Sequence, residues 1–346
     1  MGANAIVATP SSVALARVVR GLTQQELAAQ TGISQAYLSK IEKGAVELTG
    51  DRLRAVADAL GYPVEFFHTD PDAAPAPTAC AFPRKRNSLP TSAEKRIRAT
   101  LEITRLQVEP LLDDSAPAVT LPRRPADDDG WTTGAMMAMQ VREQAGIPTG
   151  PIGDLVALLE SFGVVVIVRE LGNRRIDAIG QWPDGHRPLM LINSTTGADR
   201  RRFTLAHELG HAVLHTVPQP DQESEADEFA AELLLPAAQG RELFTNSLDL
   251  ATAAALKPVW GMSMAAIVRR AYYLDRISEY RYRQLNIELS AAGYATREPA
   301  TLTAEVPTTL TAAIARHRGR GQSDADLAQL AHMTENELTA VYLEAA

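Results

Sequence analysis

The clearest signal in the chain is a cluster of apolar runs between residues 163 and 193. GVVVIVREL at 163–171 is rich in β-branched residues, which predicts a buried strand. AIGQW at 178–182 and PLMLIN at 188–193 predict two further strands, with Asp184-Gly185 at the turn between them. Elsewhere the apolar residues recur mostly at helical spacing. We therefore expect a mainly α protein with a small β-sheet, an α+β fold.

Breaks in this pattern divide the chain into four parts. Residues 70–90 hold five prolines and are typical of a linker, and a basic helix is predicted from Ser92 to about Leu112. A second polar break covers 113–130. The predicted parts are a helical module at 11–69, the linker with its basic helix at 70–130, a domain at 131–290 and a helical C-terminal region at 291–346. No internal repeat of fixed period is evident.

Composition narrows the class of protein. The 346 residues are 45% hydrophobic, carry a net charge of −8 and contain one cysteine, Cys80. A lone cysteine forbids internal disulfides and fits a reducing cytoplasm. No apolar run is long enough to span a membrane, and the N-terminus lacks the basic start of a signal peptide, so we expect a cytoplasmic protein.

Residues 23–44, TQQELAAQTGISQAYLSKIEKG, predict two short crossed helices. Thr23 and Ser34 are placed to cap them, Gly32 supplies the turn, and Gly44 ends the second helix. With a helix before and after, this pattern resembles the phage-repressor-like (XRE-type) helix-turn-helix family over about 55 residues.

That resemblance implies DNA as a partner, with the second helix in the major groove. Gln35, Ala36 and Ser39 would then face base edges, while Gln24 and Lys40, or Lys43, would meet phosphates. Residues 1–70 hold six basic and seven acidic residues, which is a weak charge for a DNA-binding module. The basic segment from Arg84 to Arg105, with seven basic and two acidic residues, or a homodimer could compensate. The alternative is a helical module that binds a protein or itself.

RFTLAHELGHAVLH at 202–215 contains the pattern HExxH. His207 and His211 lie one helical turn apart, so both imidazoles can reach one Zn²⁺. Glu208 would then sit beside the metal, where it can take a proton from the attacking water and pass it to a leaving amine. The alternative is a polar stripe on an amphipathic helix. His215 lies too far along the helix to share the metal comfortably.

A third ligand is expected on the next predicted helix, ESEADEFAAELLLP at 223–236. Glu223 and Asp227 are four residues apart and so lie on one face of the helix. This spacing fits a carboxylate ligand at Glu223. Asp227 would then accept a hydrogen bond from the other ring N–H of a ligating histidine. Glu225 is the alternative ligand.

These two segments together resemble the ImmA/IrrE family of zinc metallopeptidases, in which fusion to a helix-turn-helix is known. The similarity covers about 150–290, including PLMLIN and WGMSMAAIVRRAYYLDRIS. It implies a zincin-like, gluzincin-type site with His207, His211 and Glu223 as zinc ligands and Glu208 as base. Characterised members cut a repressor protein and so switch on phage or stress-response genes.

Further expectations concern the substrate. PLMLIN would be an edge strand with which an extended substrate pairs. Candidates for stabilising the oxyanion are Tyr272, Tyr273, His215 and Arg202, none of them preferred.

The leading function is thus a zinc endopeptidase with a DNA-binding arm and a repressor-type substrate. One alternative is a transcriptional regulator whose zincin domain senses a signal or dimerises without proteolysis. A weaker one is self-cleavage in the 70–90 or 113–130 segments.

Overall fold

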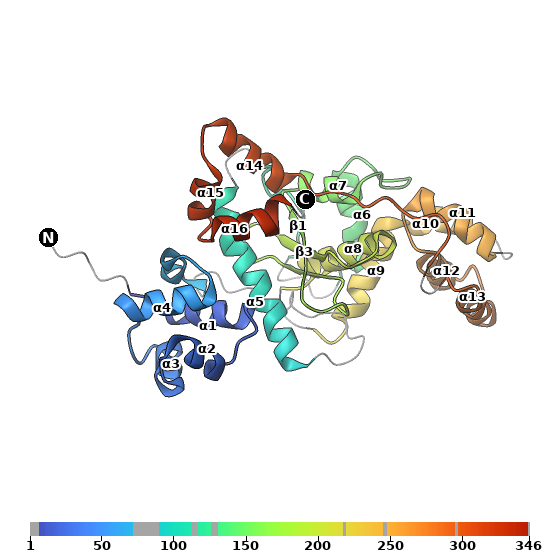
Figure 1. The fold of residues 1–346 in the computed structure, drawn as a ribbon. Coiled ribbons are helices and arrows are strands. Elements are labelled where there is room, and N and C mark those ends of the chain that lie inside the picture. Colours follow the sequence, from blue (N-terminus) through green and yellow to red (C-terminus); the bar gives the residue numbers. More distant parts are fainter. Residues whose placement is uncertain are drawn as a thin grey trace.

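The computed structural model describes residues 7–71, 90–112, 116–125, 131–216, 219–244, 248–294 and 297–344. Most of the expected linker, with Cys80, therefore lies outside the described residues. Figure 1 shows an N-terminal group of helices beside a long helix, and a small sheet between two further groups of helices. The α+β fold class expected from the sequence is confirmed.

The N-terminal module is a compact set of four helices. They are α1 (Pro10–Val19), α2 (Gln24–Thr31), α3 (Gln35–Glu42) and α4 (Gly50–Leu60), followed by a 3-10 turn at Val64–His68. Thr23 and Glu26 form a capping box that starts α2, and the Ser34 hydroxyl caps α3. Gly32 joins the two helices at a φ of 69°, a conformation that favours glycine.

Helix α5 (Thr91–Val108) links this module to the rest of the chain. Ala99 and Ile103 belong to the core of the N-terminal module, whereas Ile97 and Leu101 belong to a second core with the sheet. Arg96 Nε also donates to the Val19 carbonyl of α1 at 3.0 Å. The expected helix ran on to Leu112, but the last residues form a 3-10 turn at Glu109–Leu111, because Pro110 has no N–H for the helical ladder.

The three predicted strands form one sheet, with an order that corrects the sequence-based expectation. Strands β1 (Val165–Arg169) and β2 (Ala178–Gln181) flank β3 (Leu189–Asn193), which is parallel to β1 and antiparallel to β2. The PLMLIN strand is therefore central, and the strand beside the metal candidate is β2. The apolar run of β3 is buried at every position because helices cover both faces of the sheet.

Alternate side chains of the sheet point into two different cores. Val166 and Met190 join the core that contains helices α6 (Gly134–Gln144), α7 (Leu155–Ser161), α8 (Ala198–Leu214) and α9 (Gln222–Leu234). Val165 and Leu191 join the core shared with α5 and the C-terminal helices.

Seven further helices follow in the part of the chain that the structure describes. They are α10 (Ala237–Leu243), α11 (Leu250–Trp260), α12 (Met264–Tyr273), α13 (Glu279–Ala291), α14 (Thr309–Gly319), α15 (Asp324–Leu330) and α16 (Glu335–Leu338), the last continuing as a π-helical turn to Leu343. Figure 1 shows the chain returning after α13 to place α14–α16 beside β1 and α5. Within the described residues no single helix is long and apolar enough to cross a membrane, and the one pair that qualifies jointly, α11 with α12, is bent by 102°.

Close helix approach holds α9 between α8 and α6. A Cβ built on Gly210 of α8 would lie 3.1 Å from the Cα of Ala226, and one built on Gly134 of α6 would lie 2.4 Å from the Glu225 carbonyl oxygen. Both partners are backbone atoms of α9, so the two glycines fix how near this helix lies to its neighbours.

We predict that Gly134→Ala destabilises the fold by about 1–3 kcal/mol, because the added methyl group meets backbone that cannot rotate away. The measurement is the urea midpoint of unfolding. Gly153→Ala is the control, since nothing lies within 4 Å of its Cβ position. Equal midpoints for the two variants would show that α6 and α9 can separate without cost.

Candidate metal centre

Helix α8 places three histidines on one face. His207, His211 and His215 are each 1–2% exposed, and the ring centroids lie 4.7 Å apart for the first pair and 5.1 Å for the second. They are buried because α9 crosses this face, with Gly210 allowing the two helices to approach. A solvated polar stripe, the alternative to a site, is incompatible with this burial.

The Nε2 atoms of His207 and His211 converge with the Glu223 carboxylate. His207 Nε2 lies 3.1 Å from His211 Nε2 and 3.6 Å from Glu223 Oε2, and His211 Nε2 lies 3.4 Å from Glu223 Oε1. Ligands of a tetrahedral zinc bonded at about 2.0–2.1 Å are about 3.3 Å apart. The three groups, which all lie within 4.8 Å of one another, therefore fit such an ion in both donor type and spacing.

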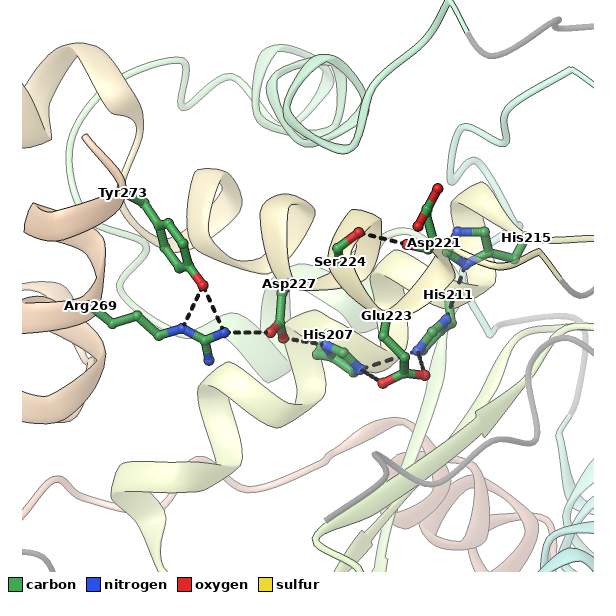
Figure 2. Close-up of polar contacts among 9 residues, drawn as sticks. All are labelled: His207, His211, His215, Asp221, Glu223, Ser224, Asp227, Arg269 and Tyr273. Carbon is green, nitrogen blue, oxygen red and sulfur yellow. Dashed lines mark hydrogen bonds and ion pairs between the residues drawn. The ribbon is translucent and has the colours of Figure 1, made fainter. Parts of the chain in front are cut away.

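A hydrogen-bond chain lies behind His207. Its Nδ1 is 2.9 Å from Asp227 Oδ1, and Asp227 Oδ2 accepts from Arg269 Nη2 at 3.1 Å. Arg269 donates in turn to the Tyr273 hydroxyl at 3.1 Å. Because the carboxylate accepts, Nδ1 carries a proton, so Nε2 is the nitrogen that would present a lone pair to a metal ion. Figure 2 shows these groups in one row that leads to Glu223 and His211.

A second chain lies behind His211. Its Nδ1 is 3.0 Å from His215 Nδ1, and His215 Nε2 is 2.8 Å from Glu225 Oε2. Arg124 Nη1 completes the chain at 3.3 Å from the same carboxylate oxygen. Glu225, the alternative ligand in the sequence analysis, thus contacts His215 and not the pair of converging imidazoles. Figure 2 shows His215 on the far side of His211 from Glu223.

The charges of the cluster favour a cation at its centre. Burial lowers the pKa of His207, but hydrogen bonds with Asp227 and Glu223 outweigh this and raise it to about 9. Hydrogen bonds with His207 and His211 hold the pKa of Glu223 far below its ordinary value. Burial lowers the pKa of His211 and so favours its neutral form beside His207. A divalent ion would supply the same kind of compensation.

Burial also sets the charge of His215. It lowers the pKa of this imidazole to about 4, against the opposing hydrogen bond with Glu225. This shift favours the neutral imidazole near pH 7.

Glu208 faces the sheet beside the converging imidazoles. It is 3% exposed, and its Oε2 accepts from the Gly180 N–H of β2 at 3.0 Å. A small pocket beside His207 and Glu208 is lined by Ala178, Thr204 and Arg200, among others. The donor in this bond is a main-chain N–H of β2, so no residue type in the sequence could have signalled the contact.

The four candidates for oxyanion stabilisation lie in different surroundings. Arg202 is buried in an ion pair with Glu305, and Tyr272 stacks on Tyr282 at 4.6 Å between ring centroids. Tyr273 is 59% exposed and joined to the cluster through Arg269. Sequence reasoning missed Arg269 and Arg124, because nothing in their local spacing marks them as partners of acids on α9.

The predicted DNA-facing residues lie together on the N-terminal module. Gln35, Ala36 and Lys40 are exposed, and Gln24 and Ser39 are half-buried beside them. Gln35 Nε2 donates to Gln24 Oε1 at 3.0 Å, and Gln24 Nε2 donates to Glu42 at 2.8 Å. These bonds join the start of α2 to the helix that would enter the groove.

Comparison with protein-family models agrees with both halves of this description. Residues 13–67 match the helix-turn-helix model, and residues 159–272 match a peptidase family model described as the IrrE N-terminal-like domain. No curated protein matches the chain. The second match includes α8, α9 and the sheet, and suggests a metallopeptidase. The chain is therefore similar to a helix-turn-helix domain over 13–67 and to an IrrE N-terminal-like peptidase domain over 159–272.

Proposed function

We propose that the protein is a zinc-dependent endopeptidase that carries a DNA-binding module. The observation that carries this proposal is the convergence of His207, His211 and Glu223 at separations of 3.1–3.6 Å, with Glu208 next to them in the chain. In this proposal the three converging groups are the zinc ligands, and Asp227 fixes the tautomer of His207 from behind.

Glu208 is assigned the proton transfers of amide hydrolysis. When bound, zinc would polarise the scissile carbonyl and lower the pKa of the attacking water. Glu208 takes the proton from that water and delivers it to the leaving amine, which a buried carboxylate beside the ligands is placed to do. The Gly180 N–H donates to Oε2 of Glu208 and so orients the carboxylate.

Strand β2 is the proposed docking edge for the substrate backbone. Among the described residues β2 pairs with β3 only, and the Gly180 N–H on its other side points to Glu208. An extended segment that pairs with this edge would pass the converging imidazoles. This assignment replaces the PLMLIN strand, which the sheet order places in the centre.

The substrate we propose is a repressor-type protein in the cytoplasm, cut in response to phage or stress signals. Support comes from the peptidase match together with the helix-turn-helix match in one chain. A peptidase that carries its own DNA-binding module is held near the operators where a repressor is bound, and a homodimer would match a two-fold operator.

The alternative is a DNA-binding regulator in which the zincin domain senses a signal or dimerises without proteolysis. One observation favours it: Glu208 is 3% exposed and already accepts a hydrogen bond from β2. In a regulator of this kind, zinc would stabilise the domain and nothing would be cut.

Glu208→Gln separates the two functions. We expect this variant to keep zinc and to lose about 10²–10⁴-fold in cleavage rate, because the amide cannot accept the proton. The assay incubates the zinc-loaded protein with repressors encoded beside its gene and follows the length of both chains by mass spectrometry. Cleavage at the wild-type rate by this variant would remove Glu208 from the mechanism. No cleavage by wild type favours the regulator.

Zinc binding should depend on the cluster and on the group behind it. We expect His207→Ala and Glu223→Gln to lose zinc, and Asp227→Asn to weaken zinc affinity about 10–100-fold. Chelator competition measures the affinity, and the zinc-induced rise in thermal midpoint gives a second measure. Glu228→Gln is the control, since this acid lies on the exposed side of α9. Unchanged affinity in Glu223→Gln would exclude Glu223 as a ligand.

DNA binding should depend on the exposed face of α3. We expect Lys40→Ala to lower affinity for a mixed-sequence duplex and to reduce the slope of log affinity against log salt by about 1, because one phosphate contact is lost. Fluorescence anisotropy at several salt concentrations measures both. An unchanged slope would place Lys40 away from the phosphates.

A further inference from the structure

Helices α14, α15 and α16 have the same arrangement in the chain as α1, α2 and α3, at an offset of 300 residues. Helix α2 spans 24–31 and α15 spans 324–330, while α3 and α16 begin at 35 and 335. We propose that residues 309–343 form a second helix-turn-helix unit, which does not read DNA but fixes the first unit to the rest of the chain.

The caps of the two units correspond residue by residue. Thr23 forms a capping box with Glu26, and Ser323 forms one with Asp326. The hydroxyls of Ser34 and Thr334 accept from the third residue of the following helix at 3.3 and 3.2 Å. Such caps determine where a helix begins.

The turns correspond as well. Gly21 and Gly321 both have positive φ, and each N–H donates to the carbonyl three residues earlier at 2.9 Å. The turn residue Gly32 has a φ of 69°, and His332 takes the same left-handed conformation at 51°. A non-glycine residue rarely adopts this conformation, so the turn is imposed by the packing of the unit.

Burial follows the same offset. Leu27 and Leu327 are fully buried, and so are Leu38 and Leu338. Each residue in 21–40 has a counterpart 300 positions later in the chain. The two are in the same class, buried, half-buried or exposed, at all positions but four, which are Ala28, Gln30, Thr31 and Gly32. Only five of the pairs between 10–44 and 310–344 are identical residues, which is why the sequence analysis found no repeat.

The second unit lacks the charges that a DNA-reading face needs. The positions of Gln24 and Gln35 hold Asp324 and Glu335, and the position of Lys40 holds Ala340. Carboxylates at these places repel phosphates, whose contacts position a helix-turn-helix on DNA. The reading face of the second unit also lies near the first: Ala325 and Glu335 line one pocket with Pro63 and Glu65.

Two positions that bond inside the first unit bond outward in the second. Arg17 and Glu42 form an ion pair at 2.6 Å that joins α1 to α3. Their counterparts are His317, whose Nε2 lies 3.0 Å from the Leu111 carbonyl, and Tyr342, whose hydroxyl donates to Gln107 of α5 at 2.9 Å. The second unit therefore has no counterpart of the Arg17–Glu42 ion pair, and the two equivalent residues instead contact α5 and the turn that follows it.

A third position contacts the first unit itself. Glu337, the counterpart of Tyr37, accepts from Arg20 Nη2 at 3.0 Å and is 12% exposed as a side chain. The same guanidinium donates through Nε to the Leu60 carbonyl at 2.7 Å and lies 4.1 Å from the centre of the Tyr62 ring. Glu337 therefore holds the end of α4, and with it the orientation of the first unit.

The docking role is tested by hydrogen exchange in the end of α4 and the residues after it, followed by mass spectrometry on the full chain. Glu337→Lys should speed exchange in residues 57–68 several-fold, and the milder Glu337→Gln should act in the same direction. Asn336→Lys is the control, because Asn336 is an exposed residue on the same helix and is not among the residues that line the pocket with Pro63 and Glu65. Equal exchange in Glu337→Lys and Asn336→Lys would overturn the docking role.

The loss of DNA reading is tested with a matched pair of substitutions. Lys40→Glu and Ala340→Glu place a carboxylate at equivalent positions of the two units. In anisotropy titrations with a mixed-sequence duplex at low salt, Lys40→Glu should weaken binding severalfold and Ala340→Glu should leave it unchanged. A comparable loss in Ala340→Glu would show that the second unit contacts DNA and would overturn the proposal.

Discussion

The convergence of two buried imidazoles with a carboxylate is the constraint on which the rest of the second domain depends. His207 and His211 can meet Glu223 only because α8 and α9 pack at the distance that Gly210 allows. Bringing these groups together where both imidazoles are buried is costly unless a positive charge balances them. Each imidazole is backed by a polar chain that contains an arginine, Arg269 on one side and Arg124 on the other. Helices α8 and α9, strand β2, and the segments that hold Arg269 and Arg124 therefore all contribute side chains or main-chain groups to this site.

The metal-ligand candidates could be predicted from the sequence because their spacing along each helix is regular. HExxH and ExxxD place side chains on one face of each helix by periodicity alone, so His207, His211 and Glu223 could be named together. The order of the sheet could not, because an apolar run such as 188–193 suits a central strand as well as an edge. The partner of His215 depends on how α9 crosses α8, and the contact of Glu208 with Gly180 involves no side chain of β2.

The C-terminal unit illustrates the same limit in another form. Its relation to the N-terminal module lies in caps, turn conformations and burial, while most of its residues differ. Helix starts need only a small hydroxyl residue followed by an acid, and a core needs only apolar residues at the right intervals. Many sequences satisfy both requirements. The two units can therefore share caps, turns and buried positions although most of their residues differ.

Helix α5 has a consequence for any break in the backbone that precedes it. Ala99 and Ile103 of this helix are part of the core of the helix-turn-helix domain, and Arg96 bonds to the carbonyl of Val19. Scission anywhere between residues 72 and 89 would leave these contacts intact. The two pieces of the nicked protein would then stay associated through the packing of α5 on the N-terminal module. Freeing the N-terminal module requires that α5 itself be undocked, and a severed chain is not by itself a released one.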